Sequence, residues 1–162
     1  MADQEAAGLA AKVLTVSDGV IAGTRQDGSG EALVELLAGE GYRLADRRAV
    51  EDGVESVRDA LSDMSDGFAG LIVTTGGTGF GPRDLTPEGT AAVLERRADG
   101  LAEAARLVSP FGRLSRAIAG TRGTALIVNL PGSPKGSVEC LGAVLDAIPH
   151  ALRLLADQPT EH

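Results

Sequence analysis

Residues 70–88 read GLIVTTGGTGFGPRDLTPE and predict a strand, a glycine-rich loop and a helix in direct succession. The apolar run at 70–75 is typical of a strand that is buried on both faces, as in the centre of a parallel sheet. Thr86 suits the N-cap and Pro87 the first position of a helix, which we expect to run to about Arg97. This stretch therefore predicts an α/β fold.

The same alternation of strands and helices continues along the chain. Apolar runs predict further strands at 11–17 and 124–130, and a strand is also expected at 42–50. Apolar residues spaced three to four apart predict helices at 31–41, 54–64, 101–108, 113–120 and 137–156. We expect Pro149 to bend or split the last helix, because proline disrupts a helix interior. The alternation predicts a mostly parallel sheet covered by helices on both faces, with ligands beyond the carboxyl ends of the strands.

Composition narrows the classes of function. The 162 residues suffice for one domain with a sizeable core. The net charge of −8 opposes non-specific binding to nucleic acid or anionic membranes, and the 2% of aromatic residues argues against a protein that stacks bases. Cys140 is the only cysteine, and neither a signal peptide nor a membrane-spanning run is recognisable. We therefore expect a cytoplasmic protein without an internal disulfide.

Two glycine-rich loops follow predicted strands. The first contains Gly76, Gly77, Gly79 and Gly81, and the second is PGSPKG at 131–136. Such loops either expose backbone N–H groups that bind a phosphate or another anion, or merely reverse the chain. The nucleotide motifs GxxxxGK[ST] and GxGxxG are both absent, the latter because its third glycine falls on Pro82. The loop at 18–30 is also rich in Gly and Asp, and it is too long for a simple connection.

Acidic residues near these loops suggest chemistry. Asp84 would repel a phosphate unless Mg²⁺ lies between them or the carboxylate accepts or donates a proton in the reaction. Alternatively, Asp84 pairs with Arg83 or caps a helix. Asp52 follows the strand at 42–50 and is either a turn residue or a second carboxylate in the same crevice. Two carboxylates beside an anion site suit metal-assisted phosphoryl or nucleotidyl transfer. Lys135 either contacts a phosphate or is a solvated surface residue.

The combination of several segments resembles the Mog/MoaB family of molybdenum cofactor biosynthesis. The segments are VLTVSDG, TTGGTGFGPRDLTPE, LSRAIAG and LIVNLPGSPKG, and the resemblance covers about residues 11 to 156. It implies one Mog/MoaB-like domain over 1–162, with a three-layer α/β/α fold and a homotrimer. It also implies a molybdopterin adenylyltransferase, which uses Mg²⁺ and ATP to attach AMP to the terminal phosphate of molybdopterin and releases pyrophosphate.

The resemblance also implies the site residues. The catalytic aspartates, which are also the implied Mg²⁺ ligands, fall on Asp52 and Asp84. The residues implied to bind molybdopterin or nucleotide are Ser17, Asp18, Gly76, Gly77, Thr78, Gly79, Glu88, Ser115, Arg116, Pro131, Gly132, Ser133 and Lys135.

An alternative function remains open within the same family. Some MoaB-type members lack activity, so the alternative is a protein that binds molybdopterin without catalysis, as a carrier or an assembly protein. A molybdate-insertion protein is an expected partner in either case. The competence-damage-inducible family has a similar glycine loop, but there an Asp-Asp pair usually replaces the Arg-Asp pair at residues 83 and 84. The Arg-Asp pair in this chain favours Mog/MoaB, and the presence of both carboxylates favours the enzyme.

Overall fold

The computed structural model describes residues 5–160, which form a six-stranded mixed sheet in the order β2-β1-β3-β6-β5-β4. The first four strands in this order are parallel, whereas β5 runs antiparallel to β6 and β4 antiparallel to β5. The strands are β1 Ala10–Val16, β2 Arg43–Val50, β3 Gly70–Thr75, β4 Arg96–Arg97, β5 Ala119–Arg122 and β6 Ala125–Leu130. The prediction of a mostly parallel sheet is confirmed.

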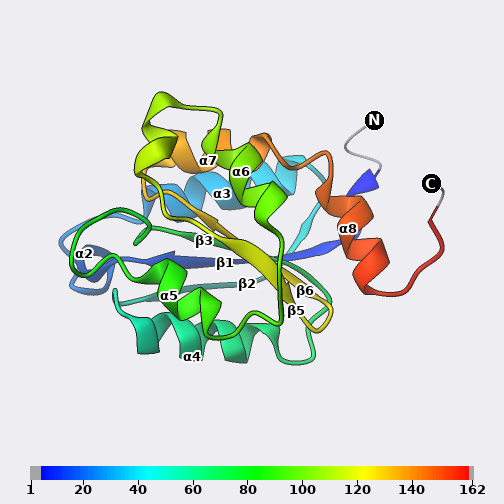
Figure 1. Cartoon of the computed structure of the whole chain (residues 1–162), viewed down its shortest axis with the longest axis horizontal. Helices are drawn as coiled ribbons and strands as arrows, with labels where there is room; N and C mark the ends of the chain where they lie inside the picture. Colours follow the sequence, from blue (N-terminus) through cyan, green and yellow to red (C-terminus); the bar gives the residue numbers. More distant parts are fainter. Residues whose placement is uncertain (1–4, 161–162) are drawn as a thin grey trace.

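Helices cover both faces of this sheet and make three layers (Figure 1). The helices are α2 Asp18–Ile21, α3 Gly28–Gly39, α4 Val54–Ser65, α5 Thr86–Ala91, α6 Asp99–Arg106, α7 Pro134–Gly142 and α8 Ile148–Leu155, with a 3₁₀ turn, η1, at Pro110–Leu114. Alternate residues of a strand point to opposite faces. Accordingly Val13, Leu71 and Val128 pack on the side of α3, α6, α7 and α8, and Leu14, Ile72 and Ile127 pack on the side of α4.

The predicted helix after the glycine loop is shorter than expected. It ends at Ala91 rather than at Arg97, because Arg96 pairs with Thr121 as part of the edge strand β4. The prediction that Thr86 is the N-cap was also wrong, since Leu85 occupies that position. The Thr86 hydroxyl instead donates a hydrogen bond of 2.9 Å to the carbonyl of Gly76. Thr86 thereby ties the start of α5 to the glycine loop.

One other helix prediction was wrong, and one is confirmed. The segment 113–120 ends η1 and then enters β5, because pairing of Ala119 and Gly120 with β6 outweighs the local helical spacing. The predicted split of the segment 137–156 is confirmed, since it is divided between α7 and α8 and Pro149 lies in the first turn of α8. Proline is tolerated there, because the first N–H groups of a helix have no partner within it.

The parallel strands direct their following loops to one edge of the sheet. The loops after β1, β2, β3 and β6 begin at residues 17, 51, 76 and 131, and they carry most of the residues implied for the site. Between residues 5 and 160, no helix combines the length and apolarity that crossing a membrane requires.

Candidate active site

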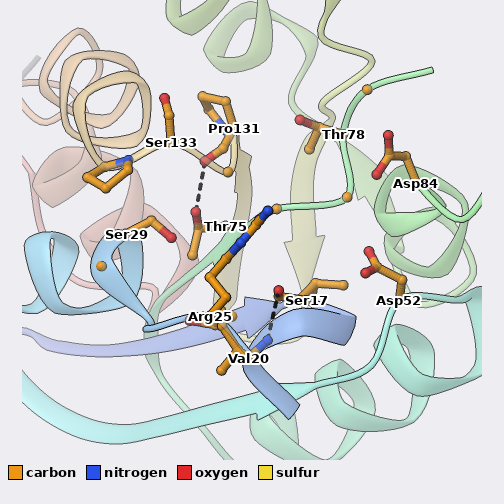
Figure 2. Close-up of a pocket in the computed structure, with 18 of the residues that line it drawn as sticks. Ser17, Val20, Arg25, Ser29, Asp52, Thr75, Thr78, Asp84, Pro131 and Ser133 are labelled. Carbon is orange, nitrogen blue, oxygen red and sulfur yellow. Dashed lines mark hydrogen bonds between the residues drawn. The ribbon is translucent and has the colours of Figure 1, made fainter. Parts of the chain in front are cut away.

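A cavity of about 740 Å³ opens at this edge of the sheet (Figure 2). Its volume is typical of a site for a small molecule. The cavity is lined by many of the residues predicted from the sequence: Ser17, Asp52, Gly76, Gly77, Thr78, Gly79, Asp84, Ser115, Pro131, Gly132 and Ser133. Four further predicted residues are not among those that line it, namely Asp18, Glu88, Arg116 and Lys135.

The first two glycines of the loop are required by its backbone. Gly76 and Gly77 have φ angles of 98° and 69°, in the region that side chains disfavour. A Cβ atom on Gly76 would lie 2.2 Å from the carbonyl oxygen of Val16, and one on Gly77 would lie 2.2 Å from the Thr86 hydroxyl. Glycine therefore allows the loop to pack directly against the end of β1.

The tip of this loop offers unpaired backbone donors. The N–H of Gly76 is used within the fold, since it donates to the carbonyl of Leu130 over 3.2 Å. Within residues 5–160, in contrast, the N–H groups of Gly77, Thr78 and Gly79 have no hydrogen-bond acceptor. All three residues line the cavity. Adjacent unpaired N–H groups beside a cavity are suited to bind an anion.

The two aspartates predicted to be catalytic flank this loop. A Cβ atom on Gly77 would lie 3.2 Å from Asp52 Oδ1, and one on Gly79 would lie 3.0 Å from Asp84 Oδ2. Asp52 Oδ2 accepts a hydrogen bond of 2.9 Å from the backbone N–H of Asp18, and Asp84 Oδ2 accepts one of 2.9 Å from that of Gly81. Both carboxylates lie on the same side of the cavity and point into it (Figure 2).

This donor set fits a magnesium ion that is shared with a substrate. No group of three or more His, Cys, Asp or Glu side chains suitable for a metal occurs within residues 5–160. Mg²⁺ is usually bound by one or two carboxylates, with phosphate oxygens of the substrate and water completing its octahedron. Asp52 and Asp84 supply such a pair beside the unpaired N–H groups of the loop.

Asp18 lies beside the cavity and is fully engaged by neighbouring residues. Its carboxylate accepts hydrogen bonds from Arg83 Nε, at 2.6 Å, and Nη2, at 3.0 Å. The bond from Arg83 lowers the pKa of Asp18 below its ordinary value, so the carboxylate loses its charge only as the pH falls through that lowered value. The sequence-based alternative of a pair between Arg83 and Asp84 does not form, because Arg83 reaches Asp18 instead.

Arg116 and Glu88 lie behind the glycine loop and hold it in place. Arg116 donates through Nε to the carbonyl of Gly79 over 2.8 Å, and its guanidinium also bonds the Asp84 carbonyl and the Glu88 carboxylate. The bond from Arg116 holds the pKa of Glu88 below its ordinary value. This support is therefore present at neutral pH and is lost as the pH falls through the lowered pKa of Glu88.

Lys135 lies outside the cavity. Its side chain is 87% exposed and its ammonium lies 3.9 Å from the Glu139 carboxylate, one turn along α7. It lines a second cavity of about 500 Å³, between α6, η1 and α7, together with the buried Cys140. Burial raises the pKa of the Cys140 thiol, as expected for a cysteine on a packed helix face.

Sequence reasoning missed several residues of the loop at 18–30. Asp27 caps α3, accepting hydrogen bonds from the Gly30 N–H, at 3.0 Å, and from the hydroxyl of Thr15. Arg25 extends over the cavity from the same loop (Figure 2). The signal that marked the loop was its length and its content of Gly and Asp, and this signal did not single out Arg25.

The fold and the cavity define an α/β protein with a cavity at the carboxyl ends of parallel strands, where two carboxylates lie beside backbone N–H groups suited to bind an anion. The family MoCF_biosynth, described as "Probable molybdopterin binding domain", matches residues 12–150, and the chain belongs to this family. The predicted resemblance to Mog/MoaB proteins is confirmed.

Individual relatives agree with the family assignment. "Molybdopterin adenylyltransferase" of Helicobacter pylori strain J99 is 40% identical over 152 residues, which are 88% of this chain and 85% of that protein. "Gephyrin" of Dictyostelium discoideum is 39% identical over 162 residues, and the match covers 91% of this chain but only 22% of that protein. The crystal structure of the molybdopterin biosynthesis enzyme MoaB from Thermus thermophilus superimposes with a TM-score of 0.88 at 45% identity, covering 94% of this chain and 99% of that one.

Proposed function

We propose that this protein is a molybdopterin adenylyltransferase of molybdenum cofactor biosynthesis, acting in the cytoplasm. In the proposed reaction, an oxygen of the terminal phosphate of molybdopterin attacks the α-phosphorus of ATP. The bond between that phosphorus and the oxygen of the leaving group breaks, and pyrophosphate departs. The observation that carries this proposal is that Asp52 and Asp84 face one cavity beside the three unpaired N–H groups of the glycine loop.

Each part of the cavity has a role in this reaction. The N–H groups of Gly77, Thr78 and Gly79 bind phosphate oxygens, and the tight packing of the loop keeps these donors in place before the substrate arrives. Asp52 and Asp84 would hold Mg²⁺, which supplies positive charge that stabilises the phosphate oxygens in the transition state. Arg116 fixes the backbone of the loop through its hydrogen bonds to the carbonyls of Gly79 and Asp84.

The alternative is a protein that binds molybdopterin without catalysis. The anion site serves both functions, whereas the paired carboxylates are required only by the enzyme. Incubation of the purified protein with molybdopterin, Mg²⁺ and ATP separates the two, with adenylated pterin and pyrophosphate measured together. We expect equal amounts of both products. Pterin binding without either product would establish the non-catalytic function.

Arg25 is expected to contact the phosphates of ATP. It is the only Lys or Arg among the described residues that line the cavity, and no ion pair within residues 5–160 involves it. Loss of one charge-assisted hydrogen bond costs about 1–2 kcal/mol. Calorimetry should therefore show that Arg25→Ala binds ATP roughly 5- to 30-fold more weakly than the wild type.

The matched control for Arg25 is Arg58→Ala, which removes an exposed cation on α4, away from the cavity. We expect this variant to bind ATP within about twofold of the wild type, a difference well under 1 kcal/mol. A large loss in Lys135→Ala with none in Arg25→Ala would instead support the phosphate contact that the sequence suggested for Lys135.

The protein is expected to form a homotrimer. The family resemblance implies this state, and the segment 107–114 exposes large apolar side chains, with Leu107 at 84% and Phe111 at 78%. Contiguous exposed apolar groups often mark an interface between proteins. Light scattering at micromolar concentration should give about three times the mass of one chain, 16.5 kDa, whereas the mass of a single chain would reject the trimer.

A further inference from the structure

Arg83 joins three loops at the edge of the sheet through hydrogen bonds. Its Nε and Nη2 atoms donate to the two carboxylate oxygens of Asp18, which follows β1. Nη2 also donates to the carbonyl of Asp52, which follows β2, over 3.0 Å. Arg83 itself belongs to the loop after β3 and directly precedes Asp84. One guanidinium therefore connects the loop that carries Asp84 with the loop that carries Asp52.

Asp18 and Asp52 are also joined directly. The backbone N–H of Asp18 donates to Asp52 Oδ2 over 2.9 Å, and the backbone N–H of Asp52 donates to Asp18 Oδ1 over 3.1 Å. The first bond orients the Asp52 carboxylate, and the second holds the backbone of Asp52 against the Asp18 carboxylate. Because Arg83 binds both oxygens of that carboxylate, the position of Asp52 depends on Arg83 through two routes.

Neither Arg83 nor Asp18 is among the residues that line the cavity, so both act on the ligand site through other residues. Their side chains are 62% and 44% exposed. An ion pair this exposed contributes little to folding stability, because water screens the two charges. Folding stability is therefore a weak explanation for the three hydrogen bonds that the Arg83 guanidinium makes here.

We infer that Arg83 and Asp18 are positioning residues that set the separation of the Asp52 and Asp84 carboxylates, so that both bind one divalent cation together with the phosphates of a nucleoside triphosphate. This inference rests on the proposed function. The planar fork of arginine suits the role, because it binds both oxygens of Asp18 and still reaches the Asp52 carbonyl. A lysine ammonium has no such fixed geometry and would restore the charge without restoring the spacing.

The test measures binding of Mn²⁺, in place of Mg²⁺, to the full chain with a non-hydrolysable ATP analogue, by water proton relaxation. Arg83→Ala is expected to weaken Mn²⁺ binding at least tenfold and to lower kcat at least tenfold, while binding of the analogue without metal changes less than twofold. Arg83→Lys is expected to restore less than half of the difference in log Kd for Mn²⁺ between Arg83→Ala and the wild type. The double variant that combines Arg83→Ala with Asp18→Ala should not lose more Mn²⁺ affinity than the single variant with the larger loss, since both side chains act as one unit.

The matched control is Arg58→Ala, which breaks an exposed ion pair with Asp59 on α4, away from the cavity. It should leave Mn²⁺ affinity unchanged. Circular dichroism establishes that each variant is folded, and Arg83→Lys provides the test if Arg83→Ala does not fold. Unchanged Mn²⁺ affinity in the folded Arg83 variants would overturn the inference, and so would additive losses in the double variant. Because Mn²⁺ binding is measured without turnover, failure of the wild type to adenylate molybdopterin would refute the proposed function separately.

Discussion

Asp84→Asn is expected to lower the rate of adenylyl transfer by at least ~10²-fold while the protein stays folded. The substitution keeps the size of the side chain and an oxygen that can accept the Gly81 N–H, but it removes the negative charge. Without this charge the proposed divalent cation would be held poorly, which would cost about 2.7 kcal/mol or more of transition-state stabilisation. Pterin binding should largely survive, because the unpaired N–H groups of the glycine loop, which we propose bind phosphate, are unchanged by the substitution. The measurement is product formation at saturating ATP and Mg²⁺, with circular dichroism and a pterin-binding assay.

The control for this prediction is Asp59→Asn, which neutralises an exposed carboxylate on α4 outside the cavity. Asp52→Asn should act in the same direction as Asp84→Asn, since its carboxylate faces the same cavity. Near-normal turnover in Asp84→Asn would remove Asp84 from the catalytic residues. Loss of folding would indicate that the bond to Gly81 is structurally essential, because Asp84 does not cap α5 in the fold.

Gly76→Ala is expected to destabilise the protein by about 3 kcal/mol or more. The φ angle of 98° at this position is strained for any residue with a side chain, which costs about 1–3 kcal/mol. The added methyl group would also lie 2.2 Å from the carbonyl oxygen of Val16, which is part of the buried strand β1 and has little room to move. Relief of this contact would displace the glycine loop from the end of β1. Urea unfolding followed by circular dichroism measures the loss.

Gly39→Ala serves as the matched control for this substitution. Gly39 is exposed in α3 and does not have a positive φ, and a methyl group added there would meet no atom within 4 Å. Alanine is favoured over glycine in a helix, so the expected change is a gain of up to about 1 kcal/mol. If Gly76→Ala lowers the free energy of unfolding by less than about 1 kcal/mol, the loop adapts to the methyl group, and the prediction that this position requires glycine is wrong.

The sequence by itself determined the parts of the fold and site that depend on short-range patterns. The runs at 11–17, 70–75 and 124–130 are apolar over most of their length, which is typical of strands buried on both faces, so the parallel centre of the sheet was predictable. The glycine loop was predictable as well, because its residues are contiguous. The placement of Asp52 and Asp84 beside one cavity followed from the rule that parallel strands end at one edge.

The tertiary structure alone decided which distant groups meet. Arg83 pairs with Asp18, 65 positions away, although Asp84 is adjacent in sequence, and Arg25 reaches the cavity whereas Lys135 does not. The predicted helices at 86–97 and 113–120 each contain residues that are strands instead, because these residues pair with neighbouring strands of the sheet. The physical reason is common to these cases: local spacing describes one helix or strand in isolation, whereas long side chains and edge strands take partners that only the assembled sheet brings within reach.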